Sequence, residues 1–297
     1  MNIDHLKIFV TVVELRHFSK AAKLLNLSQP NVSLHIRNVE NELETTLFIR
    51  SPKQVKVTAA GEKFYIKAKE ILSLYEEAKQ EIADQKHIVQ GTIKIGASFT
   101  IGEYILPRVL AEYANEHPGV NVEVIVGNTE EVISKTRSNE LDISLIEGEV
   151  IDHEIEAVPF MNDEIIIIAP TNHPLSQLRM VKPELLQDQV WILRESGSGT
   201  RAYSNQLIQN LNLHVRRSFV FSSSQGIKEA VSAGLGIAMI SRLTVRKELE
   251  LGELKEINVA NRRFTRKLSI IKGRHDFVSR AHDLFIEKIM NHEKTIE

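Results

Sequence analysis

Apolar residues recur at helical spacing in the first 15 residues of the chain. Leu6, Phe9 and Val13 lie three or four positions apart, and this spacing predicts a helix over residues 3–15. A second helix of two turns is predicted to begin at Ser19, whose hydroxyl can accept a hydrogen bond from a free backbone N–H of the first turn. The chain is therefore expected to open with two helices, the second of them short.

A third helix is predicted over residues 29–43. Ser28 provides its N-cap, and Pro30 falls in the first turn, where a missing N–H leaves no helical bond unmade. One face of this helix is apolar and must lie against a core; it consists of Val32, Ile36, Val39 and Leu43. A different face is polar and carries, one turn apart, Gln29, Ser33 and Arg37.

A short helix, a tight turn and a polar-faced helix together describe a helix-turn-helix, whose last helix fits the major groove of DNA. Two short strands, 48–50 and 55–57, then predict a hairpin wing. The wing carries cations for phosphate or minor-groove contacts, namely Arg50, Lys53 and Lys56. The alternative is a small helical domain whose polar helix faces water.

The charge of the chain is unevenly distributed. Residues 1–69 contain 11 Lys and Arg against 6 Asp and Glu, a net of +5, although the whole chain carries −2. A basic N-terminal unit on an acidic body favours contact with a polyanion such as double-stranded DNA. Chance segregation of surface charge is the alternative.

The N-terminal residues resemble the signature of LysR-type transcriptional regulators. The matching residues are Ser19-Lys20-Ala21-Ala22, Leu27-Ser28-Gln29-Pro30, Val32-Ser33, Ile36-Arg37, Glu40, Leu43, Leu47-Phe48, Arg50 and Thr58-Ala59-Ala60-Gly61. The resemblance implies that residues 28–31 and 33 approach the groove, with Arg50 and Lys53 on the wing. Leu34 departs from the family, where this position is often polar or basic. The candidate DNA-binding residues are Ser19, Lys20, Ser28, Gln29, Pro30, Asn31, Ser33, Arg37, Arg50, Lys53 and Lys56.

A long helix is predicted from Thr58, which caps it, to about residue 88. At 1.5 Å per residue it forms a rod on the order of 45 Å long. Its apolar residues alternate spacings of four and three, which is typical of a two-helix seam between protomers; they are Phe64, Ala68, Ile71, Tyr75, Ala78 and Ile82. The sequence therefore predicts a homodimer on a dyad operator, and the LysR resemblance implies a homotetramer. Packing of this helix on its own C-terminal domain is the alternative.

From Gly91 onward strands alternate with helices, which indicates two βα lobes. The expected strands are 92–97, 120–126, 141–146, 164–169, 191–192, 215–220 and 236–240, and the expected helices are 101–116, 130–139, 200–210 and 226–233. A late strand at 267–271 and a helix at 277–290 are expected to return to the first lobe. The LysR resemblance implies this topology, which is similar to that of periplasmic binding proteins with a cleft between the lobes.

The expected fold is therefore α/β: an N-terminal winged helix-turn-helix, a long linker helix and a two-lobed effector domain. The predicted domains are a DNA-binding domain at 1–58, a linker and dimerisation helix at 59–90 and an effector-binding domain at 91–297. Within the last domain, lobe I covers about 91–163 and 267–297, and lobe II covers about 164–266.

Four polar loops follow strands of the predicted lobes, where ligands of such sheets bind and where helix N-termini point. Free backbone N–H groups, hydroxyls and the helix dipole make each loop a candidate anion cradle, and Arg201 adds a guanidinium that can bind a carboxylate. The alternative for each single loop is a simple N-cap. The predicted effector is a small anionic metabolite, and the candidate effector-binding residues are Ser98, Phe99, Thr100, Thr129, Ser196, Ser198, Thr200, Arg201 and Ser223.

Several other classes find little support. The chain has no cysteine, no apolar run near the roughly 20 residues of a membrane span and no visible signal peptide, so a cytoplasmic protein is expected. Nucleophile-elbow, phosphate-loop and zinc-protease motifs are missing, and the scattered histidines indicate no metal site, so neither catalysis nor a cofactor is expected. RNA polymerase is a candidate partner. A periplasmic-type solute-binding protein and an enzyme with a DNA-binding arm are the competing interpretations.

Overall fold

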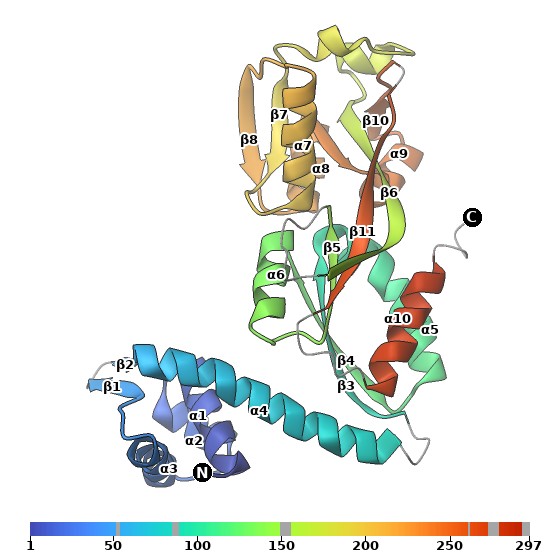
Figure 1. Ribbon diagram of the computed structural model, residues 1–297. Coiled ribbons are helices and arrows are strands. Elements are labelled where there is room, and N and C mark those ends of the chain that lie inside the picture. The colour runs from blue at the N-terminus through green and yellow to red at the C-terminus, as the bar shows by residue number, and fades with distance from the viewer. Residues whose placement is uncertain (52–53, 85–88, 149–155, 261, 273–278, 293–297) are drawn as a thin grey trace. The chain divides into compact units, whose positions relative to one another are not determined.

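A computed structural model describes residues 1–51, 54–84, 89–148, 156–260, 262–272 and 279–292. The chain divides into two compact units, Met1–His87 and Ile88–Glu297, shown in Figure 1. The linker helix belongs to the first unit. Each unit is described by itself.

The N-terminal unit is a winged helix-turn-helix followed by a long helix. Its elements are α1 (Ile3–Leu15), α2 (Phe18–Leu24), α3 (Gln29–Glu42), β1 (Phe48–Ser51), β2 (Gln54–Val57) and α4 (Ala59–Asp84). The two strands pair antiparallel, with Phe48 opposite Val57, and form the predicted wing. Thr58 caps α4, because its hydroxyl accepts a hydrogen bond from the Gly61 N–H at 2.9 Å.

Ser28 caps α3 as predicted, and the Asn31 N–H donates to its hydroxyl at 3.3 Å. The predicted cap at Ser19 is wrong. The N-cap of α2 is His17, whose Nδ1 accepts from the Lys20 N–H at 3.4 Å, so Ser19 already lies in the first turn. The helix therefore begins two residues earlier than a cap at Ser19 would place it, and Phe18 of its first turn packs edge-on against Phe48.

The core of the N-terminal unit lies between its helices and the wing. Val32, Ile36 and Val39 of α3 are fully buried in it, which confirms three members of the predicted stripe. The fourth, Leu43, is partly exposed, because it is the C-cap residue and lies beyond the last turn that faces the core. Phe9 of α1 is central, with its ring 5.5 Å from that of Phe48.

In the C-terminal unit, nine strands of the described part form one continuous sheet in the order β4-β3-β5-β11-β6-β9-β7-β8, with β10 paired to β6. The strands are β3 (Gly91–Ser98), β4 (Val120–Gly127), β5 (Ile143–Glu147), β6 (Glu156–Pro170), β7 (Val190–Arg194), β8 (Arg217–Phe221), β9 (Ile237–Ser241), β10 (Leu254–Ile257) and β11 (Phe264–Lys272). The first three pair in parallel, as do β7, β8 and β9.

The helices between these strands are η1, a π-helix (Ile101–Ile105), α5 (Leu106–Glu116), α6 (Thr129–Arg137), α7 (Gly199–Asn210), α8 (Ser224–Ser232), α9 (Arg246–Glu250) and α10 (Arg280–His292). Three short 3-10 helices complete the described part: η2 (Pro174–Gln177), η3 (Pro183–Leu186) and η4 (Arg242–Val245). The sequence reading missed β10 and α9, which are short and lack periodicity.

Two long antiparallel strands, β6 and β11, run from lobe I to lobe II and hold the lobes together (Figure 1). At one end β11 pairs with β5 of lobe I, and at the other end β6 pairs with β9 of lobe II. The sequence predicted only the lobe II part of β6 and the lobe I part of β11. The parts of β6 and β11 that run between the lobes were not predicted, because they carry charged residues such as Asp163 and Arg266 inside the strands.

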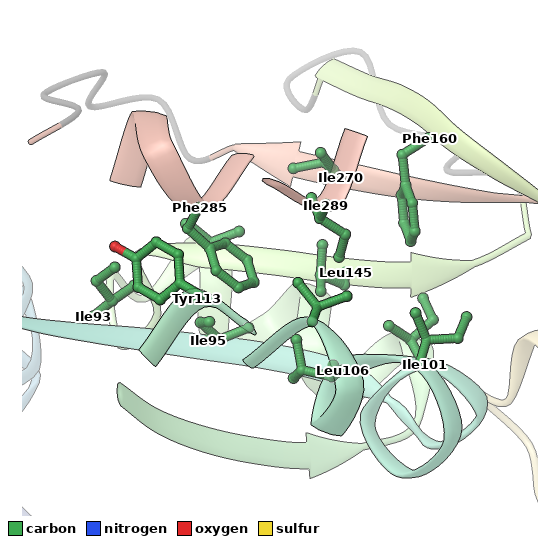
Figure 2. Packing of buried hydrophobic residues seen from close by; sticks show 14 of the residues in the cluster. Ile93, Ile95, Ile101, Leu106, Tyr113, Leu145, Phe160, Ile270, Phe285 and Ile289 are labelled. Carbon is green, nitrogen blue, oxygen red and sulfur yellow. The ribbon is translucent and has the colours of Figure 1, made fainter. Parts of the chain in front are cut away.

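Lobe I has its main core between the sheet and helices α5 and α10, which Figure 2 shows. Phe285 of α10 packs edge-on against Tyr113 of α5 at 5.5 Å, and the Tyr113 hydroxyl donates to the Ala281 carbonyl at 2.8 Å. Through this contact the last helix packs against the core of lobe I. In lobe II, Trp191 is fully buried in the core.

Candidate functional site

The first turn of α3 is exposed and polar. Gln29, Pro30 and Asn31 all lie at the surface, directly after the cap residue Ser28. The Gln29 side-chain amide donates to the Ser33 hydroxyl at 3.0 Å, which places both residues on one face of the helix. Amide and hydroxyl side chains at the N-terminus of such a helix can hydrogen-bond base edges or phosphates.

Basic side chains lie on the elements around α3. Arg37 is exposed on α3 itself, Ser19 and Lys20 are exposed at the start of α2, and Lys56 is exposed on β2. Lys53 lies outside the described residues, as does the side chain of Arg50 on β1. Among the candidate DNA-binding residues, those that are described belong to α2, α3 or the wing, apart from Ser28, which caps α3.

The predicted seam of α4 divides into two parts. Two of its members pack within their own unit: Ala68 is fully buried in the N-terminal core, and the ring of Phe64, which is partly buried, lies 4.9 Å from that of Phe9. Because α1 packs against this part of α4, both residues contribute to the core of their own unit. Farther along, the helix exposes a run of apolar side chains, namely Ile71, Leu74, Tyr75, Ala78 and Ile82.

In the C-terminal unit, one buried guanidinium lies where the two lobes meet. Arg266 of β11 forms ion pairs with Glu147 of β5 at 2.6 Å and with Asp163 of β6 at 2.7 Å. It also donates to Thr200 of α7 at 2.9 Å and to Thr100, which precedes η1, at 3.1 Å. We call these five residues the junction cluster. Lobe I contributes Thr100 and Glu147, and lobe II contributes Thr200.

The electrostatics of the junction cluster keep its central pair charged. Burial alone would raise the pKa of Glu147, but the Arg266 charge and the Thr100 N–H outweigh burial and hold this pKa below its ordinary value. Burial likewise opposes the charge of Arg266, yet Glu147 and Asp163 raise its pKa above the usual value. An unpaired charge at this depth would be strongly unfavourable, so each member depends on the others.

Some of the predicted effector-binding residues lie at the junction cluster, and others cap helices. Ser98, Thr100, Thr129 and Thr200 are all buried beside Glu147 or Arg266, and the Thr129 hydroxyl donates to the Glu147 carbonyl at 3.3 Å. The structure thus brings hydroxyls from both lobes together. Ser198 and Ser223 serve as N-caps of α7 and α8, as in the alternative interpretation of these loops.

Two predicted residues have surroundings that differ from the expectation. Ser196 is exposed and makes no hydrogen bond among the described residues. Arg201 was expected to direct its guanidinium toward a ligand. Instead its Nη1 donates to the Arg194 carbonyl at 2.7 Å and its Nε to Asn205 at 2.9 Å, so the side chain binds its own lobe.

Sequence reasoning missed the buried cations of the junction. Besides Arg266, lobe II directs two cations toward lobe I: Arg194 stacks on Phe99, 4.6 Å from the ring centroid, and Lys228 lies 5.8 Å from the ring of Tyr104. Each also has a carboxylate on its own lobe, Glu195 for Arg194 at 2.8 Å and Glu248 for Lys228 at 2.6 Å. These cations could have been found in the sequence, because each lies within an otherwise apolar strand or helix face. A charge at such a position is buried and therefore requires a partner.

Glycines let the lobes approach closely. A Cβ on Gly199 would lie 2.5 Å from the Glu147 carbonyl oxygen, so only glycine allows the start of α7 to lie against the end of β5. Gly197 has φ +86°, and a side chain there would meet Glu130 of α6. The loop at 195–200, which contains both glycines, therefore provides close contact between the lobes as well as the cap of α7.

Among the described residues, no helix combines the length and the apolar composition that a membrane span requires. Within the same ranges, no three His, Asp or Glu side chains are grouped so that they could hold a metal ion.

Comparison with known proteins covers both units. The family model "Bacterial regulatory helix-turn-helix protein, lysR family" matches residues 3–62, and the model "LysR substrate binding domain" matches residues 87–293. The HTH-type transcriptional regulator CysL of Bacillus subtilis is 46% identical over 271 residues, covering 91% of each chain. A probable RuBisCO transcriptional regulator of Phaeodactylum tricornutum is 33% identical, covering 99% of this chain and 98% of its own.

Solved structures agree on the fold. A full-length OxyR variant from Pseudomonas aeruginosa aligns with a TM-score of 0.77 at 22% identity, covering 99% of this chain and 95% of that one. The regulatory domain of CcmR from Synechocystis PCC6803, solved in complex with 2-PG, aligns with a TM-score of 0.65 at 26% identity, covering 70% of this chain and 99% of that one. A periplasmic-type solute-binding protein is not favoured, because the helix-turn-helix is also matched. The chain belongs to the LysR family of transcriptional regulators, with a DNA-binding helix-turn-helix unit and an effector-binding unit.

Proposed function

We propose that this regulator binds an interrupted dyad operator as a homodimer, or as a dimer of such dimers, and that a small anionic metabolite at the lobe junction controls it. The observation that carries the proposal is the meeting of Thr100 and Thr200, one from each lobe, on the buried guanidinium of Arg266. A ligand there changes the arrangement of the lobes only as far as it binds one arrangement better than another.

The exposed first turn of α3 supports the DNA part of the proposal. Gln29 and Asn31 have the amide side chains that pair with base edges in the major groove. Lys20, Arg37 and Lys56 supply sequence-independent phosphate contacts. Pairing of two such units sets the spacing of the half-sites, at about one helical turn or a multiple of it.

Substitution of Ile71 by aspartate tests the dimer. Ile71 is 40% exposed on α4, within the apolar run that ends at Ile82. A buried, unpaired carboxylate in a two-helix seam is strongly unfavourable, so Ile71→Asp is expected to give monomers in sedimentation and to abolish specific operator binding. Lys67→Asp, on an exposed position of the same helix, is the control. A variant Ile71→Asp that stays dimeric would refute the seam.

The charges at the junction support an anionic effector. Three buried cations, Arg194, Lys228 and Arg266, face the boundary between the lobes. Glu103 lies near two of these cations; partial desolvation raises its pKa, and the charges of Arg194 and Lys228 oppose that rise. The CcmR regulatory domain was solved with 2-PG, and this relative supports a small metabolite as the class of ligand.

Calorimetric titration of the full chain with a panel of small anions tests the effector. We expect at least one anion to bind, and we expect Thr100→Ala and Thr200→Ala each to weaken binding by about tenfold, the loss of one hydrogen bond to a charged group. Ser218→Ala, at an exposed serine of β8 outside the junction cluster, is the control. Unchanged affinity in both threonine variants would refute the assignment.

Three further parts of the proposal follow from the regulatory function. We place the protein in the cytoplasm, where its DNA lies, and we assign it no catalytic activity. RNA polymerase is the partner through which a bound regulator would act on transcription.

A further inference from the structure

The carboxylate of Glu147 occupies the polar positions that an anionic ligand would use. Its Oε1 accepts the backbone N–H of Thr100 at 2.8 Å. Its Oε2 accepts Arg266 Nη1 at 2.6 Å and the Thr200 hydroxyl at 3.2 Å. These donors, a free backbone N–H, a hydroxyl and a guanidinium, are the groups that recognise a carboxylate or another small oxyanion.

Each nitrogen of the Arg266 guanidinium already has an acceptor within its own protein. Its Nε and Nη2 contact Asp163 at 2.8 and 2.7 Å, its Nη1 contacts Glu147 and Thr200, and its Nη2 also contacts Thr100. A guanidinium has five N–H donors; four of them make hydrogen bonds to these residues, and Nη2 also lies in an ion pair with Asp163, so each of the three nitrogens already faces an acceptor. An anion from solution can therefore reach Arg266 only by replacing an acceptor that is already present.

Of the two acids that contact Arg266, one is the easier for a ligand to replace. A ligand carboxylate added beside Glu147 and Asp163 would place a third negative charge around one guanidinium. A ligand carboxylate that takes the place of one of these acids keeps the charge around Arg266 unchanged and leaves its donors satisfied. Asp163 lies inside β6 and also accepts the Ser241 hydroxyl at 2.6 Å. Glu147 is the last residue of β5 and precedes Gly148, which has φ +86°. Movement of Glu147 thus disturbs the end of a strand and not its middle.

We propose that Glu147 is a built-in occupant of the anion site at the lobe junction, and that the effector acts by displacing its carboxylate. This inference rests on the proposed function of the same site. An attached carboxylate competes at high effective concentration, so small anions bind the native chain weakly. Displacement breaks the bridge that Glu147 makes between Thr100 of lobe I and Thr200 of lobe II.

The variant Glu147→Gln tests the inference, with acetate as the probe. A glutamine amide directs an NH2 group at donors that need an acceptor, so the side chain holds the site less firmly. Titration of the full chain with acetate, at an ionic strength kept constant with chloride, is expected to give a Kd about tenfold lower for Glu147→Gln than for the native chain. Glu164→Gln makes the same charge change at an exposed acid paired with Arg242 and is expected to leave the Kd unchanged.

Equal acetate affinity in the native chain and in Glu147→Gln would overturn the inference, as would an equal gain in Glu164→Gln. Should Glu147→Gln fail to fold, Glu147→Asp keeps the charge but withdraws the carboxylate by one methylene. That variant is also expected to bind acetate more tightly, and an unchanged Kd overturns the inference. Operator binding by the same proteins is measured separately, so loss of the inference is distinguishable from loss of the proposed function.

The absence of cysteine from the sequence allows an independent measurement. Spin labels on Asn115→Cys of α5 and Gln206→Cys of α7, both exposed positions, report the distance between the lobes. Saturating acetate is expected to shift this distance in the native chain, and Glu147→Gln is expected to need less acetate for the same shift. A distance that stays constant at all acetate concentrations contradicts displacement of the bridge.

Discussion

Replacement of Arg266 by methionine is expected to lower the free energy of unfolding of the C-terminal unit by about 3–5 kcal/mol, because it leaves buried acids without their partner. Arg266 is the shared partner of Glu147 and Asp163 and contacts both lobes. Trp191 is the one tryptophan of the chain and is fully buried in lobe II, so its fluorescence during urea unfolding reports the effect. Arg263→Met, at an exposed arginine three positions away, is the matched control.

The pH dependence of this loss has a defined sign. In the native chain the pKa of Glu147 is lowered, so its stabilising effect is present above its ordinary pKa of 4.5 and is lost as the pH falls through the lowered value. Without Arg266, burial would raise the pKa of the acids. Protonation would then remove their unpaired buried charge and reduce the loss of stability in the variant. The difference in the free energy of unfolding between the native chain and Arg266→Met should therefore become smaller toward acid pH. A loss no greater than that of Arg263→Met would contradict the role of the junction cluster.

Replacement of Asn31 by alanine is expected to weaken binding to a specific operator by about 1–3 kcal/mol, or roughly 5- to 150-fold, because one good base contact contributes that much discrimination. Asn31 is exposed, so the fold should be retained. Affinity for unrelated DNA should stay nearly constant, since that affinity comes from phosphate contacts. Fluorescence anisotropy at fixed salt measures both affinities.

Asn41→Ala is the matched control for this prediction. Asn41 is exposed near the C-terminal end of α3, whereas recognition helices place their N-terminal residues on the base edges. Equal losses for Asn31→Ala and Asn41→Ala, or an equal loss on specific and unrelated DNA, would show that the first turn of α3 does not read sequence.

Local patterns sufficed to predict the N-terminal unit, because its signals lie close together in the chain. Ser28 and Pro30 mark the start of α3, and the spacing of Val32, Ile36 and Val39 gives its buried face. Periodicity could not tell which chain an apolar face packs against. Phe64 therefore looked like a residue of an intermolecular seam, although it packs against Phe9 of its own unit.

The junction cluster was only half visible in the sequence. Thr100 and Thr200 precede or open predicted helices after strands, and that position placed both near one site. Arg266 gave no such sign, because its partner Glu147 lies 119 residues away and the strand that carries it crosses both lobes. Contacts of that range depend on sheet order, which local spacing does not determine.

Recovery of bound fragments from sheared genomic DNA of the source organism, at moderate salt, tests the central claim most directly. We expect a small set of fragments that share an interrupted dyad to be enriched over bulk competitor with the native chain, and to be clearly less enriched with Asn31→Ala. Recovery of fragments in the same proportions as in the input DNA, with and without added anions, would contradict it.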